Sequence, residues 1–523
     1  ILKNALTREL QDAWILKKSK PHINTERCFI NSYGMVPIGL WLDVINICKE
    51  FNIPFVLSEN TIKYISQFDL DKEGFTDYIK TTFENSTKPS KNANEPGTPF
   101  VPRPYQIDAA YALLKYRFAS GEISTSGGKT LISFMIFRYL HDRCNIKKIL
   151  YIVPSVDLAN QSSNDYNEYE TYLMEKNQTE WSTGVLRSGL KKAEKEAVEN
   201  CTILFGTFQS LCKKSLEFFQ KFDAVMVDEA HHLASSNSMK NIINKCTNLK
   251  YAISFTGTFP RKETIGYYNI QSYIGPLVYK LSANDLINQQ KSATPIYTIF
   301  EIMDWCDNEN KDLLYQMRKA KQLAQNRNDI TFGAKLLRQE TDFINSAYIR
   351  MKYIGDMAIK MAKNTLILFG DIKGGYGKRL YEYINENSDK NVYYVDGYTP
   401  NKNRDYYKQQ CENDTEGKTV LVASIGTFGE GIDIKNIWSI FLVNSAKSER
   451  LVRQICGRGL RQYPGKDKTV LYDFVDDLRV KREDSYGDNY MWKHYKERRK
   501  IYLEQKFPVY EQKVKFQREN SLL

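Results

Sequence analysis

Two series of short apolar segments, separated by helix-like stretches, constrain the fold more than any other feature of this sequence. The first series reads KKILYIVP, CTILFGTF, FDAVMVDEA and YAISFTGT, and the second reads NTLILFGD, NVYYVDG, KTVLVAS, WSIFLVN and KTVLYDF. Runs rich in Ile, Val, Leu and Phe that lack polar alternation are typical of parallel strands covered by helices on both faces. The sequence therefore predicts an α/β fold with two doubly wound parallel-sheet domains in tandem.

Length and local composition predict further parts around these two domains. The chain has 523 residues, which is too long for a single hydrophobic core. A stretch rich in Pro, Ser, Asn and Gly is typical of a linker, and the C-terminal segment is helix-prone and dense in Lys and Arg. We expect a small α+β domain at 1–85, the linker at 86–101, the two sheet domains at 102–285 and 286–480, and a helical basic tail at 481–523.

Composition bounds the class of protein. Hydrophobic residues make up 42% of the chain and charged residues 26%, and no apolar run approaches the roughly 18 residues of a membrane helix. We find no signal peptide, although the sequence starts at Ile1 rather than Met, so a short leader could precede it. Nine cysteines without a C-x-x-C pair favour free thiols in a reducing cytoplasm. The net charge of +12 is compatible with a nucleic-acid partner, but many basic proteins bind no nucleic acid.

The segment GEISTSGGKT indicates a phosphate-binding loop. Backbone N–H groups of Gly127 and Gly128 at a helix N-terminus can hold phosphate oxygens. Lys129 can reach the β- and γ-phosphates, and the Thr130 hydroxyl can bind Mg²⁺. The usual pattern has a glycine where this chain has Ile123, which we expect at the end of a strand. The alternative interpretation is a tight turn before an ordinary helix.

Two adjacent carboxylates end the apolar run FDAVMVDEA. Asp228 and Glu229 would lie at the C-terminal end of a buried strand, where α/β sheets bind ligands. Asp228 can hold Mg²⁺ through water, and Glu229 can polarise an attacking water molecule. The alternative is a helix N-terminus that favours acidic residues.

A second phosphate-directed site is indicated by LVRQICGRGLRQ. Arg458 and Arg461 are three residues apart, so we expect them on one helical face. Two guanidinium groups suit the charge that develops on a γ-phosphoryl group during hydrolysis. A solvated basic helix is the alternative, although Gly457 and Gly459 would weaken such a helix. Upstream, GTFGEGIDI is a Gly-rich turn able to approach a ligand closely.

Eight motifs, in their order and spacing, resemble those of DEAH-box-type superfamily 2 helicases. They are RPYQ, STSGGKT, VPSVDLANQ, GTFQS, DEAH, TGT, TFGEGID and QICGRGLR, within residues 102–474. The resemblance implies two RecA-like domains that bind ATP and Mg²⁺ between them. It implies nucleotide-binding roles for Arg103, Tyr105, Gln106, Thr125, Ser126, Gly127, Gly128, Lys129, Thr130, Asp228, Gly431 and Asp433, with Thr130 and Asp228 also as metal ligands. Catalytic roles are implied for Glu229, Gln454, Arg458 and Arg461, with Arg461 as the arginine finger.

The same resemblance implies a nucleic-acid path that contacts phosphates without reading bases. The implied residues are Pro154, Ser155, Gly206, Thr207 and Gln209 in the first domain and Ser424 and Thr427 in the second. Taken singly, each is a residue type that caps helices or forms turns, and this is the alternative interpretation. We see no base-reading motif, as expected of a motor that runs on any sequence.

Over most of its length the chain also resembles the UvsW helicases of T-even and related phages. The resemblance includes INSYGMVPIGLWLDVINICKEFNIPFVL, RMKYIGDMAIKMA and RRKIYLEQKFPVYEQKV. It implies a DNA helicase or translocase that unwinds or branch-migrates forks, Holliday junctions and R-loops in phage replication, recombination and repair. It implies a nucleic-acid-binding type of N-terminal domain, branched DNA or RNA–DNA hybrid as partner, and phage replication or recombination proteins as further partners. We expect a monomer in the cytoplasm of the host.

Two rival functions stay open at this stage. An RNA helicase would use the same phosphate contacts, and a nucleic-acid-annealing or binding module could keep a vestigial ATP site. The intact Lys129, Asp228, Glu229 and Arg461 argue against the second rival.

The basic tail also allows two interpretations. Its cationic residues alternate with aromatic ones, a mixture that can hold phosphates and stack bases. The alternative is a helix that packs its aromatic side chains on the second domain with lysines outward. The residues concerned are Lys493, Lys496, Arg498, Arg499 and Lys500, with Trp492, Tyr495 and Tyr502 between them.

Overall fold

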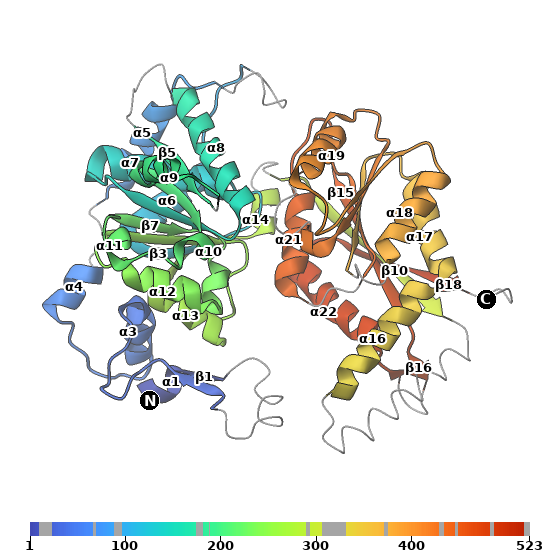
Figure 1. The fold of residues 1–523 in the computed structure, drawn as a ribbon. Coiled ribbons are helices and arrows are strands. Elements are labelled where there is room, and N and C mark those ends of the chain that lie inside the picture. Colours follow the sequence, from blue (N-terminus) through green and yellow to red (C-terminus); the bar gives the residue numbers. More distant parts are fainter. Residues whose placement is uncertain are drawn as a thin grey trace. The chain divides into compact units, whose positions relative to one another are not determined.

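The computed structural model describes residues 1–9, 24–65, 70–87, 97–173, 181–187, 189–288, 293–305, 331–370, 375–427, 434–444, 448–481 and 486–516. The chain divides into two compact units, Ile1–Ser282 and Ala283–Leu523 (Figure 1). Each unit is built around one parallel sheet, and every apolar run of the two predicted series forms a strand. The α/β prediction is therefore confirmed.

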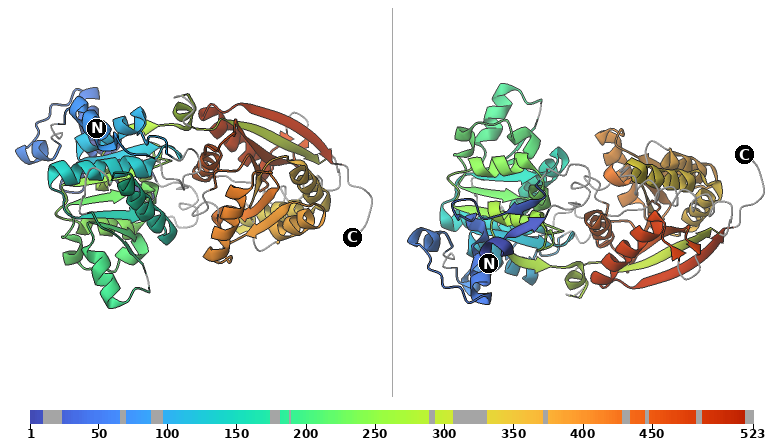
Figure 2. Two further views of the ribbon diagram at one scale, coloured as in Figure 1. Left: turned by 90° about the horizontal axis from the view of Figure 1, so that it is seen from above. Right: turned by 90° about the horizontal axis from the view of Figure 1, so that it is seen from below.

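In the first unit, the described residues form a seven-stranded parallel sheet in the order β5-β6-β4-β7-β8-β3-β9. Helices cover both of its faces (Figures 1 and 2). The strands are β3 (Phe118–Ile123), β4 (Ile149–Val153), β5 (Thr183–Leu186), β6 (Ile203–Thr207), β7 (Ala224–Val227), β8 (Tyr251–Thr256) and β9 (Leu277–Leu281). The helices are α6 (Pro104–Tyr116), α7 (Lys129–Cys144), α8 (Val156–Leu173), α9 (Lys192–Asn200), α10 (Phe208–Leu211), α11 (Leu216–Phe219), η2 (Ala230–Ala234), α12 (Asn237–Lys245) and α13 (Ile265–Tyr273).

In the second unit, the described residues form another seven-stranded parallel sheet, in the order β12-β13-β11-β14-β15-β10-β18. Its strands are β10 (Ile296–Trp305), β11 (Thr365–Phe369), β12 (Asn391–Val395), β13 (Thr419–Ser424), β14 (Ser439–Leu442), β15 (Thr469–Asp477) and β18 (Val509–Phe516). The helices are α14 (Ala283–Asn288), α16 (Thr331–Ser346), α17 (Tyr348–Lys360), α18 (Tyr376–Glu386), α19 (Asn401–Asn413), α21 (Glu449–Gly459) and α22 (Tyr490–Glu504). The short strands β16 (Val480–Lys481) and β17 (Tyr486–Gly487) form a separate two-stranded antiparallel sheet.

The two sheets have the same topology. When the strands of each unit are numbered in chain order, both sheets run third, fourth, second, fifth, sixth, first, seventh. Strands of the same rank therefore occupy the same place in each sheet. The units are two copies of one doubly wound architecture, as expected of tandem RecA-like domains.

This topology corrects the description of the tail as helical. The tail does contain α22, but it continues into β18, which pairs with β10 and holds the position that β9 holds in the first sheet. The strand was missed because its sequence, VYEQKVKF, is rich in charged residues. Such residues are characteristic of a strand at the edge of a sheet, where they discourage further pairing.

The N-terminal segment is a small α+β arrangement, as predicted. It contains α1 (Leu2–Ala5), β1 (Thr7–Glu9), β2 (Glu26–Cys28), η1 (Ile38–Leu40), α3 (Trp41–Glu50), α4 (Glu59–Ile65) and α5 (Lys72–Phe83), with β1 and β2 antiparallel. Leu6, Phe29 and Leu40 pack around Tyr268 of α13. At Gly39 a Cβ would lie 1.9 Å from the carbonyl oxygen of Gln271, so only glycine allows this close approach.

The N-terminal segment is also joined to the first sheet domain through α5. Phe75 lies against Tyr139 of α7, with ring centroids 5.2 Å apart, and Tyr78 donates a hydrogen bond to Asp142 at 2.7 Å. Residues 88–96 of the predicted linker lie outside the described residues. Among the described helices, none combines the length and apolar character that crossing a membrane requires.

Candidate functional site

Two loops that carry predicted nucleotide-binding residues follow nearby strands of the first sheet. Strands β7, β8 and β3 are adjacent, and their carboxyl ends share one edge because all three are parallel. The loop after β3 leads to Lys129, and the loop after β7 contains Asp228 and Glu229. Residues far apart in sequence are thereby brought together, with Lys129 Nζ 3.4 Å from Glu229 Oε1.

The loop between β3 and α7 needs glycine at two positions. Gly128 caps α7 with φ of +79°, and a Cβ there would lie 2.2 Å from Gln106 Nε2. At Gly127 a Cβ would lie 2.7 Å from Ile123 Cγ2. Ile123 itself is the last residue of β3 and is fully buried, so the expectation of a strand end there is confirmed. Its side chain belongs to the core, and the loop does not require glycine at that position.

The RPYQ motif is bonded to the phosphate loop through Gln106. The buried Gln106 accepts a hydrogen bond from Arg103 N at 2.9 Å through Oε1, and its Nε2 donates to the carbonyl oxygen of Gly127 at 3.3 Å. The Arg103 guanidinium donates to the Tyr105 hydroxyl at 3.2 Å, and Tyr279 donates to the Tyr105 carbonyl oxygen at 3.1 Å. The structure therefore places these three predicted residues beside the loop.

Glu229 is oriented by its backbone and by two cationic or polar neighbours. Its φ of 51° and ψ of 48° are left-handed, a conformation that non-glycine residues rarely adopt. One carboxylate oxygen contacts Lys129, and the other lies 3.1 Å from His231 Nδ1. Burial acts to raise the pKa of Glu229, but Lys129 and His231 outweigh it and hold the pKa below its ordinary value. The side chain is therefore a fixed, ionised acceptor, as a group that orients an attacking water needs to be.

Asp228 is a buried carboxylate that suits a cation. One of its oxygens accepts a hydrogen bond from Glu229 N at 2.8 Å. Burial raises the pKa of Asp228 to about 6, the Lys129 charge opposes this rise, and the Glu229 charge adds to it. A buried carboxylate is costly unless a cation compensates it, and carboxylate and hydroxyl oxygens are the donors that Mg²⁺ prefers. Asp228 and the half-buried Thr130 therefore fit a Mg²⁺ site.

His231 and Thr256 belong to this site, although neither is among the residues predicted from the sequence. His231 Nδ1 also lies 3.0 Å from the hydroxyl of the buried Thr256, at the end of β8. That hydroxyl donates to the Thr258 carbonyl oxygen at 3.2 Å and accepts from Thr258 N at 3.1 Å. The contacts link the Glu229 loop to the loop after β8. Both residues stand in quoted motifs, DEAH and TGT, and the adjacency of their strands is the signal that joins them.

The arginine site differs from the predicted geometry. Helix α21 contains Gln454 and Arg458 but ends at Gly459, and Arg461 lies in a turn in which its N–H donates to the Arg458 carbonyl oxygen at 3.3 Å. The prediction that both arginines share one helical face is therefore wrong. Gly459 packs the helix end against the sheet, since a Cβ there would lie 3.1 Å from Ile296 Cδ1. Gly431 and Asp433, two predicted nucleotide-binding residues, lie outside the described residues.

The predicted nucleic-acid residues lie at equivalent strand ends in the two sheets. Thr207 is the last residue of β6 and Ser424 the last residue of β13, and each strand is the fourth of its unit. Pro154 and Ser155 directly follow β4, the neighbour of β6.

Most of these residues also have a local structural role. Ser155 accepts from Leu158 N at 3.3 Å, and Thr207 accepts from Ser210 N at 3.2 Å, so both cap helices. The hydroxyls of Ser424 and Thr427 lie 2.7 Å apart. Gly206 is buried against Leu211, whereas Gln209 is exposed.

In the tail, the packing interpretation is confirmed for the aromatic residues. Trp492, Tyr495 and Tyr502 are buried, and the rings of Tyr495 and Tyr502 lie 4.8 and 5.5 Å from that of Phe300 in β10. Arg498 is 1% exposed and forms a paired contact with a buried aspartate of β15. The tail therefore belongs to the core of the second unit.

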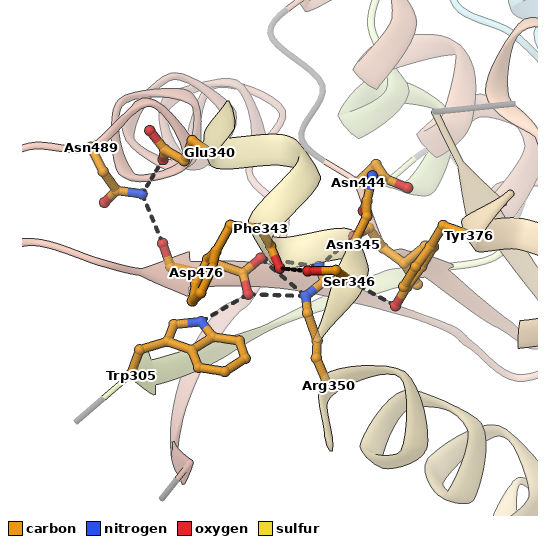
Figure 3. A network of polar contacts seen from close by, with 11 residues as sticks. Trp305, Glu340, Phe343, Asn345, Ser346, Arg350, Tyr376, Asn444, Asp476 and Asn489 are labelled. Carbon is orange, nitrogen blue, oxygen red and sulfur yellow. Dashed lines mark hydrogen bonds and ion pairs between the residues drawn. The ribbon is translucent and has the colours of Figure 1, made fainter. Parts of the chain in front are cut away.

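A buried polar network fixes the carboxyl edge of the second sheet (Figure 3). Arg350 Nε lies 2.9 Å from an Asp476 carboxylate oxygen near the end of β15, and Trp305 Nε1 donates to the same oxygen at 3.1 Å. The guanidinium of Arg350 also donates to the Tyr376 hydroxyl at 2.8 Å and to the Val443 carbonyl oxygen at 2.6 Å. Because Val443 directly follows β14, this network holds the strand end that precedes α21.

Known protein families match both units of the chain. Residues 99–261 match the family described as "Type III restriction enzyme, res subunit", and residues 350–462 match the "Helicase conserved C-terminal domain". The first match contains the phosphate loop and the carboxylates, and the second contains the arginine site. The chain belongs to the superfamily 2 helicases. It is therefore an ATP-dependent helicase, and its nucleotide is ATP.

Individual relatives agree with this assignment. The helicase is 28% identical over 418 residues to "ATP-dependent DNA helicase uvsW" of Enterobacteria phage T4, a match that covers 78% of this chain and 76% of the relative. Its fold is similar to that of "ATP-dependent Type ISP restriction-modification enzyme LlaBIII bound to DNA", with a TM-score of 0.56 at 14% identity over 83% of this chain and 32% of that one. It is also similar to Mss116p "bound to ssRNA and AMP-PNP", with a TM-score of 0.51 at 13% identity over 79% of this chain and 74% of that one. At such identities the two solved structures show the shared fold alone.

Proposed function

We propose that this helicase is an ATP-driven motor that unwinds or branch-migrates branched DNA, with forks, Holliday junctions and R-loops as its substrates. The observation that carries the proposal is the similarity to the T4 helicase uvsW, which covers 78% of the chain and is longer than the two family matches together. The N-terminal segment and tail, outside the family matches, resemble the same phage helicases.

The proposed chemistry assigns one role to each cluster of the nucleotide site. Gly127, Gly128 and Lys129 hold the phosphates, and Thr130 and Asp228 hold Mg²⁺, which supplies positive charge to the phosphate oxygens. Support comes from the left-handed Gly128 of the loop and from the buried carboxylate of Asp228, whose pKa burial raises.

Glu229 and the arginine site act on hydrolysis itself in this proposal. Glu229, held by Lys129 and His231, accepts the proton of the attacking water. Arg461, with Arg458, stabilises the charge that develops on the terminal phosphate. Gln454 is proposed to lie near the attacking water. The intact set argues against a vestigial ATP site.

The adenine-binding role falls to the RPYQ segment. We propose that Tyr105 and Gln106 contact the base and that Arg103 supports them, with Thr125 and Ser126 lining the phosphate loop. The hydrogen bond from Gln106 to the Gly127 carbonyl oxygen is the supporting contact, because it connects the proposed base-binding segment to the phosphate loop. Gly431 and Asp433 complete the proposed nucleotide set.

The proposed nucleic-acid contacts lie at the carboxyl ends of β4 and β6 in the first sheet and of β13 in the second. Thr207 and Ser424, at equivalent positions in the two sheets, would contact phosphates of one strand through hydroxyl and backbone N–H groups. Pro154, Ser155, Gly206, Gln209 and Thr427 complete this set. Their capping roles do not conflict with the proposal, because the backbone N–H groups of a helix N-terminus also bind phosphate.

An RNA helicase is the second candidate function. One observation favours it: the chain is 24% identical over 321 residues to "Putative ATP-dependent RNA helicase L396" of Acanthamoeba polyphaga mimivirus. Contacts to phosphates do not distinguish the two nucleic acids, whereas a contact to the 2′-hydroxyl would. We further propose that the protein works as a monomer in the host cytoplasm alongside phage replication or recombination proteins.

The test is the ATPase rate of the full chain with no nucleic acid, with single-stranded RNA and with forked DNA. The proposal expects forked DNA to give the largest stimulation. Stimulation by RNA together with no response to forked DNA would replace the proposal with the RNA helicase. No stimulation by either would favour the annealing module.

A further inference from the structure

The turn that follows the arginine site directs a lysine back to the end of α21. In the sequence YPGK, Gly465 has φ of +74°, and Lys466 N donates to the Tyr463 carbonyl oxygen at 3.0 Å. Proline followed by a left-handed glycine is the signature of a type II turn. The turn reverses the chain within four residues and brings the Lys466 side chain under the last turn of the helix.

The Lys466 amine donates to carbonyl oxygens of two separate motifs. Its Nζ lies 3.0 Å from the Arg461 carbonyl oxygen and 3.2 Å from that of Gly459, at the end of α21. It also reaches the Lys435 carbonyl oxygen at 3.5 Å. Lys435 is the residue after GTFGEGIDI, so this one side chain joins the segment that follows this motif to the arginine site. The last carbonyls of a helix lack helical donors, and a cation at that end is favourable.

Two threonines complete the support of the same turn. The Thr294 hydroxyl donates to the Arg461 carbonyl oxygen at 3.0 Å, and the Thr469 hydroxyl donates to that of Gly459 at 2.7 Å. The Thr294 N–H donates to the Leu460 carbonyl oxygen at 2.9 Å. Three consecutive carbonyls at the helix end are therefore bonded to side chains or backbone from neighbouring segments, with Lys466 shared between two of them.

The charges around Lys466 act in opposite directions. Burial lowers the pKa of Lys466 to about 7, Glu412 of α19 opposes this shift, and the charge of Arg461 adds to it. Glu412 also accepts a hydrogen bond from Lys435 N, so it faces the same junction. A lysine buried to this degree needs acceptors for its amine, and the carbonyl oxygens of Arg461, Gly459 and Lys435 provide them.

We propose that Lys466 is a positioning residue for ATP hydrolysis, which holds the backbone of the Arg458–Arg461 turn so that Arg461 keeps one orientation. The inference rests on the proposed function, in which Arg461 stabilises the terminal phosphate in the transition state. Because Lys466 contacts the Arg461 carbonyl oxygen rather than its side chain, it acts through the placement of that residue. Misplacing a catalytic group by about 1 Å can cost about 100-fold in rate.

The test compares Lys466→Met with Lys468→Met in the full chain, using ATPase assays with forked DNA. Methionine keeps the length of the side chain but removes its donors, and Lys468 is an exposed lysine two residues further along the same segment. We expect K466M to lower kcat about 10- to 100-fold with KM for ATP changed less than about 2-fold, because the interaction lost acts in the transition state. K468M should behave as the wild type, and K466R should recover part of the loss. A wild-type kcat for K466M overturns the inference.

A double-mutant comparison with Arg461→Ala separates this inference from the proposed function. If Lys466 acts through Arg461, K466M should cost little more in the R461A background than R461A costs alone. Independent, additive losses overturn the positioning role. A wild-type kcat for R461A would instead overturn the proposed role of Arg461 itself.

Thr294→Val provides a milder variant if K466M does not fold. It removes only the hydroxyl that donates to the Arg461 carbonyl oxygen and preserves the shape of the side chain. We expect a loss in kcat of about 2- to 10-fold, with KM for ATP unchanged, because a single neutral hydrogen bond to this carbonyl is lost. A T294V enzyme with lowered affinity for ATP and unchanged kcat would contradict the inference.

Discussion

Removing Arg498 should destabilise the second unit far more than it changes nucleic-acid binding. Arg498 lies in α22 and forms a bidentate pair with Asp473: Nε donates to one carboxylate oxygen at 2.7 Å, and a terminal nitrogen donates to the other at 2.7 Å. The Tyr502 hydroxyl donates to the same carboxylate at 2.8 Å. Arg498 and Asp473 are 1% and 0% exposed. Arg498→Met would leave a buried carboxylate with only the Tyr502 hydroxyl as side-chain donor among these contacts.

The size of the effect follows from the burial. Breaking a buried ion pair by removing one partner costs about 3–5 kcal/mol. For a unit of roughly 240 residues, about 2–4 °C per kcal/mol gives a fall in melting temperature of about 6–20 °C. The neighbouring Arg499→Met is the matched control, because Arg499 and Glu511 form a pair whose side chains are 45% and 39% exposed. Such an exposed pair is worth about 0–1 kcal/mol.

The assay is thermal unfolding of both variants near neutral pH, together with the affinity for forked DNA measured by fluorescence anisotropy below the melting temperature. We expect R498M to unfold at a much lower temperature, R499M to unfold as the wild type does, and R498M to retain the affinity of the wild type while folded. A wild-type melting temperature for R498M combined with a large loss of affinity would refute the reasoning. It would return Arg498 to the nucleic-acid-binding interpretation of the tail.

Three further predictions concern the nucleotide site and the arginine turn. Glu229→Gln keeps the size of the side chain but removes the charge that contacts Lys129, so kcat should fall about 100-fold or more while ATP still binds; unaffected turnover would contradict the role of Glu229. In Gly128→Ala, alanine must adopt a left-handed backbone and displace Gln106, which costs about 1–3 kcal/mol. KM for ATP should therefore rise about 5-fold or more, and an unchanged KM would contradict the phosphate-binding role of the loop. The pKa of Lys466 is lowered to about 7, so its amine loses one donor as the pH rises from about 6.5 to 8.5, whereas an arginine stays charged. The kcat of the wild type relative to K466R should therefore fall over this range, and a constant ratio would contradict it.

The central strands could be read from the sequence because burial on both faces leaves a continuous apolar run. KKILYIVP and NTLILFGD are examples, and both form strands inside their sheets. The edge strand β18 gives a weaker signal. The run VYEQKVKF carries charged residues because β18 is an edge strand among the described strands, so its pattern does not distinguish it from a basic helix.

The nucleotide site could be located from sequence, but its internal contacts could not. Lys129 and Glu229 were identified from separate motifs, and their contact depends on β7, β8 and β3 being neighbours, which no local pattern encodes. The same holds for the bond between His231 and Thr256. Arg461 was expected on a helix because of its spacing from Arg458, yet the bonds that end α21 come from residues distant in sequence or beyond the helix.

Strand displacement by the wild type and E229Q tests the central claim most directly. Forked DNA, a four-way junction, an R-loop and an RNA duplex would each be incubated with ATP and Mg²⁺, with labelled strands resolved by native gel. The account predicts ATP-dependent displacement or migration on the DNA forks and junctions, none with E229Q, and little on the RNA duplex. Efficient displacement of the RNA duplex with forks and junctions left intact would contradict it.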